Sequence, residues 1–221
     1  MWAILQHAPW EGPGLIAAAL DAHGFEFRVH RLDQGEAVPE TVPDGLVVMG
    51  GPMGVYEARQ FPFLSEEQRL LRACLAEDLP VLGVCLGAQL MAAALGAEVS
   101  RGATLEAGEG SVTLTGAGRA DAVIGIGCGE LPVVHWHQGT FPLPQGTELL
   151  ASSRLYPMQA FRAGRYGYGL QFHLELQPEQ ARQWREQGLT ITPEHEQRVR
   201  EAGERVVDNF LHLAAARPAL R

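Results

Sequence analysis

The sequence places a cysteine in the pattern Gly-x-Cys-x-Gly, formed by Gly83, Cys85 and Gly87. An apolar run typical of a buried strand precedes the cysteine, and a run with helical character follows it. This order predicts a sharp strand-to-helix turn that presents the thiol outside the sheet. Because a helix N-terminus offers free N–H groups and a positive dipole end, it favours a thiolate and can hold a developing oxyanion. The alternative is a buried core thiol, the usual place of a free cysteine.

A nucleophilic cysteine needs a base, and the base needs an acceptor that orients it. His173 and Glu175 follow an expected strand, and side chains two residues apart can lie on one face of an extended segment. With Cys85 they predict a Cys-His-Glu triad. The competing interpretation is that His173 is a core histidine and that Glu175 caps a helix beginning at Pro178.

The composition narrows the classes of function. The 221 residues, 46% of them hydrophobic, can build one sizeable core, so a single domain over residues 1–221 is expected. All 17 basic residues are arginines, which excludes lysine nucleophiles and lysine-containing phosphate loops. The net charge of −9, without a basic run, argues against nucleic acid and anionic membrane as partners. Cys74, Cys85 and Cys128 have no metal-type spacing, so neither a disulfide framework nor a zinc site is expected.

The first residues of the sequence lack the basic and apolar regions of a signal peptide. No apolar run reaches membrane-spanning length. These features predict a cytoplasmic protein, and nothing in the sequence indicates a cofactor.

Strands and helices alternate through the first part of the chain. The expected strands are 2–6, 25–32, 46–49 and 80–84, and the expected helices are 13–23, 65–76 with Ser65 as its cap, and 90–95. This order predicts an α/β fold with a mostly parallel central sheet and helices on both faces. Sites in such sheets form beyond the carboxyl ends of the strands, which places the glycine-rich residues 50–54 beside Cys85.

The middle of the chain changes character. Residues 98–135 are rich in Gly, Thr, Val and Glu, and expected strands at 111–115 and 133–137 predict a small antiparallel, hairpin-like insert. Further strands are expected at 149–152, 158–162 and 168–173, and helices at 178–187 and 193–216.

Five segments, taken together, resemble the class I (triad-type) glutamine amidotransferases, and among them stand-alone proteins similar to the amidotransferase domain of GMP synthase. The matching segments are residues 50–54, 83–89, 135–141, 159–162 and 171–175. The resemblance implies a flavodoxin-like fold and attack by Cys85 on the γ-carboxamide of glutamine or of a γ-glutamyl relative. A γ-glutamyl thioester would form, ammonia or an amine would leave, and water would release glutamate. His173 would transfer the protons and Glu175 would orient it.

The resemblance also implies where the substrate is held. The backbone N–H groups of Gly51 and Leu86 would bind the oxyanion, and Gln89 would line the glutamine pocket. His135, His137 and Gln138 would lie in the substrate-side segment, which in this sequence departs from the family pattern at Gly139.

Gly139 stands where the family has an aspartate that helps to bind the α-amino group of the substrate. Glycine removes the charge that would pair with an ammonium. Either Gln138, His135 or His137 compensates, or the true substrate lacks a free α-amine. His135 and His137 also share a strand face, as metal ligands can, but no carboxylate or third ligand is seen to accompany them, so no metal site is expected.

Three functions remain open from the sequence. The first is glutamine hydrolysis with ammonia passed to a separate synthetase subunit, because the chain carries no nucleotide-binding loop of its own. The second is a self-contained γ-glutamyl hydrolase or peptidase. The third, disfavoured by the intact triad pattern, is a non-catalytic binding module that keeps the cysteine turn for structural reasons.

Overall fold

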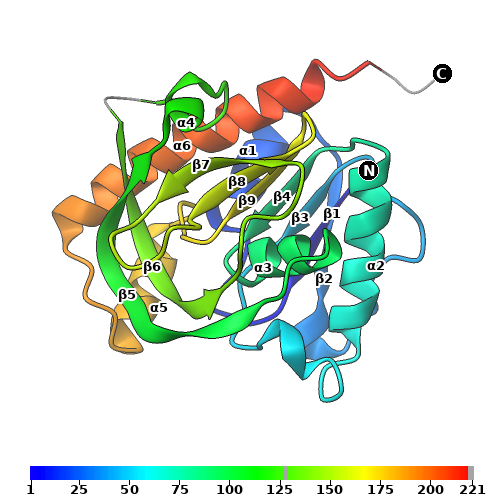
Figure 1. Cartoon of the computed structure of the whole chain (residues 1–221), viewed down its shortest axis with the longest axis horizontal. Coiled ribbons are helices and arrows are strands. Elements are labelled where there is room, and N and C mark those ends of the chain that lie inside the picture. The colour runs from blue at the N-terminus through cyan, green and yellow to red at the C-terminus, as the bar shows by residue number, and fades with distance from the viewer. Residues whose placement is uncertain (127–128, 219–221) are drawn as a thin grey trace.

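The computed structural model describes residues 1–126 and 129–218, so Cys128 lies outside the described residues. Their strands form one nine-stranded sheet in the order β2-β1-β3-β4-β9-β8-β7-β5-β6 (Figure 1). The strands are β1 (Trp2–Gln6), β2 (Phe27–Arg31), β3 (Leu46–Val48), β4 (Val81–Val84), β5 (Ser100–Leu114), β6 (Glu130–Thr140), β7 (Thr147–Ser152), β8 (Ala160–Ala163) and β9 (Gly167–Leu170).

The parallel half of the sheet runs from β2 to β9, and all its neighbouring strands pair in parallel. The helices α1 (Gly14–Ala22), α5 (Pro178–Glu186) and α6 (Pro193–Ala215) pack on one face, and α2 (Phe63–Ala76) and α3 (Leu86–Ala94) pack on the other. Successive residues of β1 show why both faces need cover, since Ile4 belongs to the first core and Leu5 to the second. The expected α/β fold with helices on both faces is confirmed.

The antiparallel half extends further than the expected hairpin. β5 pairs with β6 as expected, and β7 and β8 continue the same antiparallel pairing up to β9. β5 begins at Ser100, well before the expected strand at 111–115. Its glycine-rich first part lacks apolar alternation and is held in the sheet by backbone pairing with β6. Its register with β6 shifts between Arg101 and Glu106, and the two strands form a curved ribbon at one end of the sheet (Figure 1).

Several element boundaries differ from the expectation. Ser65 does not cap α2, because the helix begins at Phe63 after Pro62, whose fixed φ suits the start of a helix. The short elements α4 (Gly116–Ala120), η1 (Leu32–Gln34) and η2 (Val55–Glu57) have no clear apolar period and were not expected. Within the described ranges, no helix combines the length and the apolar character that crossing a membrane requires.

Candidate active site

Cys85 occupies the turn between the end of β4 and the first residue of α3. Its backbone has φ +51°, a conformation that side chains other than glycine rarely adopt. The flanking glycines make the turn possible, because a Cβ on Gly87 would collide with the carbonyl oxygen of Val48. A Cβ on Gly83 would lie 2.7 Å from the backbone of Gly87. The strand-to-helix turn predicted from the sequence is therefore present, with the thiol at the N-terminus of α3.

The positive φ at Cys85 predicts an unusual order of stability for two substitutions. At most buried positions Gly is less stable than Ala by about 0.5–1 kcal/mol, because it loses more backbone entropy on folding. Here the order should reverse, with Cys85→Gly more stable than Cys85→Ala by about 1–2 kcal/mol, because glycine relieves the backbone strain. Urea unfolding of the two variants measures the difference. The usual order, with Ala more stable, would mean that the turn carries no strain.

His173 and Glu175 form a buried pair directly after β9. Nδ1 of His173 lies 2.7 Å from Oε1 of Glu175, and the other carboxylate oxygen accepts from the backbone N–H of Leu174 at 3.0 Å. The backbone of His173 pairs with Val134 of β6, and the ring of Trp184 packs edge-on against the imidazole. The orientation of the imidazole is thus held from three sides.

The other ring nitrogen of His173, Nε2, is buried and has no hydrogen-bond partner among the described residues. A ring nitrogen of His173 and Sγ of Cys85 lie within 4.8 Å of one another. Glu175 does not cap α5, whose cap residue is Gln177. The arrangement is what a thiol and its base require, and the alternative of a fully satisfied core histidine does not fit it.

Burial and the neighbouring charges set the protonation of this pair. Burial lowers the pKa of His173, but the Glu175 carboxylate and the Cys85 side chain outweigh it and raise this pKa well above its usual range. Burial raises the pKa of the Cys85 thiol, and His173 opposes that effect. A thiolate at Cys85 is therefore stable chiefly as an ion pair with the imidazolium.

This pairing predicts that Cys85 is the first cysteine to react with an alkylating reagent. Cys74 is fully buried on α2, and burial raises the pKa of its thiol to about 12. Brief treatment with limiting iodoacetamide, followed by peptide mass spectrometry, should find the label on Cys85. Label on Cys74 or Cys128 before Cys85 would contradict the assignment of the nucleophile.

The loop of residues 50–54 lies beside Cys85, as expected from the ends of β3 and β4. A Cβ on Gly51 would lie 2.7 Å from Cβ of His7 and 2.9 Å from Cδ2 of Leu86, so the two expected oxyanion donors belong to adjoining residues. Behind the loop, His7 contacts the carbonyl oxygen of Gly50 through Nδ1 at 3.0 Å and Glu67 through Nε2 at 2.8 Å. This second buried His–Glu pair fixes the loop, and the sequence reasoning missed it. The one feature of the sequence that could have indicated this pair is a polar residue, His7, directly after the buried strand β1.

A pocket of about 340 Å³ opens beside this loop. Gly51, Gln89, Gln138 and Gly139 line it, together with Arg101 and Glu57. Nε of Arg101 donates to Oε1 of Gln138 at 2.9 Å. Four of the residues expected at the substrate and oxyanion sites are thus brought together.

His135 and His137 do not line this pocket. They alternate with Trp136 and Gln138 along β6, so their side chains lie on the opposite face of that strand from Gln138. There Oε2 of Glu106 lies 3.0 Å from Nε2 of His137 and 3.5 Å from Nδ1 of His135, and it accepts from Gln159 at 2.8 Å. Substrate contact by either histidine therefore finds no support in the geometry.

The expectation that no carboxylate accompanies His135 and His137 is wrong, because the neighbouring strand β5 supplies Glu106. The sequence hides this contact, since the two strands are joined by a long connection. Burial lowers the pKa of His135 to about 4, so its imidazole is neutral at ordinary pH. The described residues contain three groups of possible metal ligands whose ligand atoms lie within 4.8 Å of one another: Glu11 with Cys85 and His173, Glu106 with His135 and His137, and His23 with Asp208 and His212.

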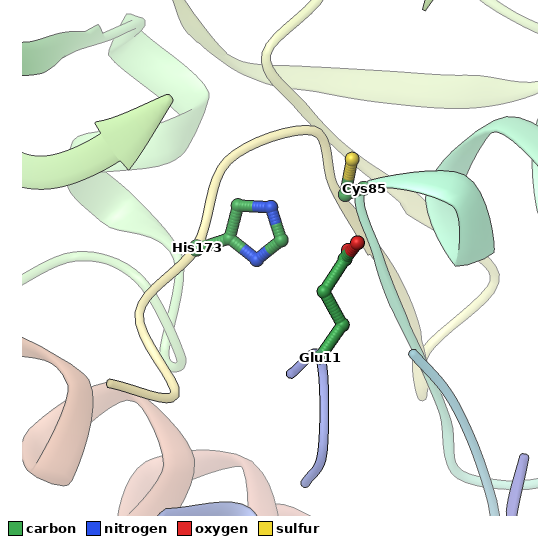
Figure 2. A group of neighbouring side chains, drawn as sticks. All are labelled: Glu11, Cys85 and His173. Carbon is green, nitrogen blue, oxygen red and sulfur yellow. The ribbon is translucent and has the colours of Figure 1, made fainter. Parts of the chain in front are cut away.

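Sequence reasoning also missed Glu11. It lies in the loop between β1 and α1, is 5% exposed, and points its carboxyl group toward Cys85 (Figure 2). A Cβ on Gly50 would collide with a carboxylate oxygen of Glu11 and lie 3.1 Å from Cε1 of His173. Its only signal in the sequence was the turn-forming run Gly-Pro-Gly that follows it.

Comparison with known proteins identifies the family of the chain. Over 175 residues the chain is 33% identical to the glutamine amidotransferase-like protein YfeJ of Salmonella typhimurium. The aligned segment covers 77% of this chain and 73% of YfeJ. It is 32% identical to the glutamine-hydrolysing GMP synthase of Leifsonia xyli over 83% of this chain, and it spans only 34% of that enzyme's length.

A solved structure of a glutamine amidotransferase from Methylobacillus flagellatus matches with a TM-score of 0.87 at 26% identity, over 96% of this chain and 94% of that one. The family model for class-I glutamine amidotransferases matches residues 14–189. The chain therefore belongs to the class-I glutamine amidotransferases.

Proposed function

We propose that the protein hydrolyses the γ-carboxamide of glutamine through a γ-glutamyl thioester on Cys85. The observation that carries the proposal is the buried thiol at a helix N-terminus within reach of His173, whose ring Glu175 orients at 2.7 Å. Membership in the family supports amide hydrolysis in general. The roles of the individual residues are the proposal.

The reaction proceeds in two halves. The Cys85 thiolate attacks the γ-carbonyl carbon, and the backbone N–H groups of Gly51 and Leu86 stabilise the oxyanion. The imidazolium of His173 donates its proton to the leaving nitrogen, the C–N bond breaks, and ammonia departs. Neutral His173 then takes a proton from water, which attacks the thioester. The C–S bond then breaks, which releases glutamate and restores the Cys85 thiolate and the His173 imidazolium, and the proton of the new γ-carboxyl group passes to solvent.

The ammonia would pass to a separate synthetase. The chain spans about a third of the length of the GMP synthases that it matches. A self-contained γ-glutamyl hydrolase is the second candidate. It is favoured by one observation, that Gly139 places no carboxylate at its position in the pocket.

A substrate panel tests the proposal. The protein is incubated with L-glutamine, N-acetylglutamine and γ-glutamyl amides of alkylamines, and released glutamate and ammonia or amine are measured. Glutamine turnover that Cys85→Ala abolishes supports the first function. Turnover of the alkylamides with glutamine inert supports the hydrolase, and no release from any substrate contradicts both.

Gly139→Asp is expected to improve the use of free glutamine. A well-placed carboxylate should bind the α-ammonium with about 1.5–3 kcal/mol, or about tenfold or more, seen mainly in KM. A Cβ at this position would lie 2.5 Å from Nε2 of Gln89, the mobile end of that side chain, so Gln89 must shift slightly. N-acetylglutamine has no ammonium and serves as the control. An equal change in kcat/KM for both substrates would show that residue 139 does not face the amine.

A further inference from the structure

Glu11 is a buried carboxyl group beside the reacting thiol for which the two-step reaction has no role. One of its oxygens, Sγ of Cys85 and a ring nitrogen of His173 all lie within 4.8 Å of one another. Figure 2 shows the carboxyl end of Glu11 and the ring of His173 approaching Cys85 from two different segments of the chain. The site therefore has three converging polar groups, besides the orienting Glu175.

Packing alone does not account for this residue. Burial raises the pKa of Glu11, and the charge of Glu175 adds to that, although His173, His7 and a hydrogen bond with Trp10 oppose it. A buried carboxyl group is costly unless it has a partner. Among the described residues the side chain of Glu11 has no strong ion pair of its own, in contrast to Glu67 and Glu175, which each contact a histidine.

The loop that carries Glu11 is fixed to the same part of the protein as the base. The backbone N–H of Leu15 donates to the carbonyl oxygen of Glu175 at 3.0 Å, and Nε2 of Gln180 donates to the carbonyl oxygen of Gly12 at 2.9 Å. A Cβ on Gly14 would collide with that same carbonyl oxygen of Glu175, so the loop approaches as closely as a glycine permits. Glu11 and His173 are thus held in a constant relation to each other.

The reaction itself defines where the leaving nitrogen lies. This nitrogen is bonded to the carbon that Sγ attacks, and it must come within hydrogen-bond distance of Nε2 of His173 to receive the proton. A carboxylate oxygen close to both Sγ and the imidazole therefore borders the same position. It can accept a hydrogen bond from an N–H of the leaving group while His173 protonates the nitrogen lone pair.

We propose that Glu11 accepts this hydrogen bond and makes the site selective for a primary carboxamide. The inference rests on the proposed function and names its leaving-group specificity. A primary amide carries two N–H groups, so one can point to Glu11 throughout the reaction. An N-alkyl amide has lost one of the two, and an ester has none. Glu11 therefore favours release of ammonia over release of an amine or an alcohol.

The test compares an amide with an ester that differs only in the leaving group. L-Glutamine and the γ-methyl ester of L-glutamate form the first pair, and their N-acetyl forms serve as a second pair in case the α-ammonium is not bound. For Glu11→Ala we expect kcat/KM for the amide to fall by about tenfold to a hundredfold, the usual effect of a hydrogen bond to a charged group. The value for the ester should fall by less than about threefold, because it has no N–H to lose.

Two further variants separate this role from a structural one. Glu11→Gln keeps the shape and an acceptor oxygen but loses the charge. Its kcat/KM for the amide should therefore lie between the values of the wild type and of Glu11→Ala. Glu67→Gln is the matched control, a buried glutamate paired with His7 behind the loop of residues 50–54. It should change amide and ester turnover in the same proportion. Turnover of the ester also shows directly that each variant is folded.

The outcomes distinguish the inference from the function on which it rests. If kcat/KM of Glu11→Ala falls equally for amide and ester, or does not fall for the amide, the role of Glu11 is overturned and the thioester mechanism is unaffected. Failure of the wild type on both substrate pairs overturns the proposed function, and the role of Glu11 falls with it.

Discussion

His173→Ala should lower kcat for glutamine hydrolysis by roughly five to six orders of magnitude, comparable to the loss of the base in other nucleophilic triads. In the proposed reaction His173 donates a proton to the leaving nitrogen in the first half and accepts one from water in the second. His7 cannot replace it, because both of its ring nitrogens are engaged, one with Gly50 and the other with Glu67. Without the imidazolium, the buried thiolate also loses its counter-charge.

Glu175→Ala should be less severe. Its loss in kcat should be roughly one to two orders of magnitude smaller than that of His173→Ala. Glu175 contacts the imidazole and raises the pKa of His173, and in the proposed reaction it makes no contact with the substrate. The measurement is single-turnover hydrolysis of glutamine by both variants, with thermal melting to verify the fold. Equal and small effects of the two changes would show that the triad is assigned wrongly.

Gly87→Ala should damage both the fold and the activity. The added Cβ would collide with the carbonyl oxygen of Val48, which belongs to the backbone and cannot rotate away. Either β3 or the first turn of α3 must move, and both adjoin the candidate active site. We expect a loss of roughly 3 kcal/mol or more in the free energy of unfolding, from overpacking in a filled core. For a chain of this size, that loss corresponds to a fall in Tm of about 6–12 °C.

Gly116→Ala is the matched control for this substitution. Gly116 also lies in the first turn of a helix, but no atom would lie within 4 Å of its added Cβ. Its Tm should therefore stay near the wild-type value. If the melting temperatures of the two variants are similar, the close approach of α3 to β3 does not constrain residue 87.

The parallel half of the fold and the turn at Cys85 could be predicted because their signals are local. Apolar runs mark the strands, and two glycines flank the cysteine within five residues. His173 and Glu175 were found for the same reason, since a spacing of two on an extended segment is readable directly. These residues lie together in the structure, and their catalytic roles remain predictions.

The remaining contacts of the site depend on approaches between distant segments, which no local pattern encodes. Glu106 reaches His137 across a strand pair, and Glu67 reaches His7 from a helix on the other face of the sheet. Family resemblance placed the segment around His137 near the substrate, but it did not say which face of β6 each side chain occupies. Glu11 was missed because a single glutamate in a loop carries no pattern.

The position of β9 in the sheet has a consequence for how the protein is made. β9 fills the centre of the sheet between β4 and β8, although β4 ends at Val84 and β9 begins only at Gly167. During synthesis the outer edge of β4 remains unpaired until this late strand emerges, and an unpaired apolar edge is prone to aggregate. His173 follows β9 by three residues, so closure of the sheet and delivery of the base are nearly one event. A growing chain therefore carries Cys85 without its proposed base, and the thiol comes to lie beside His173 only as the sheet is completed.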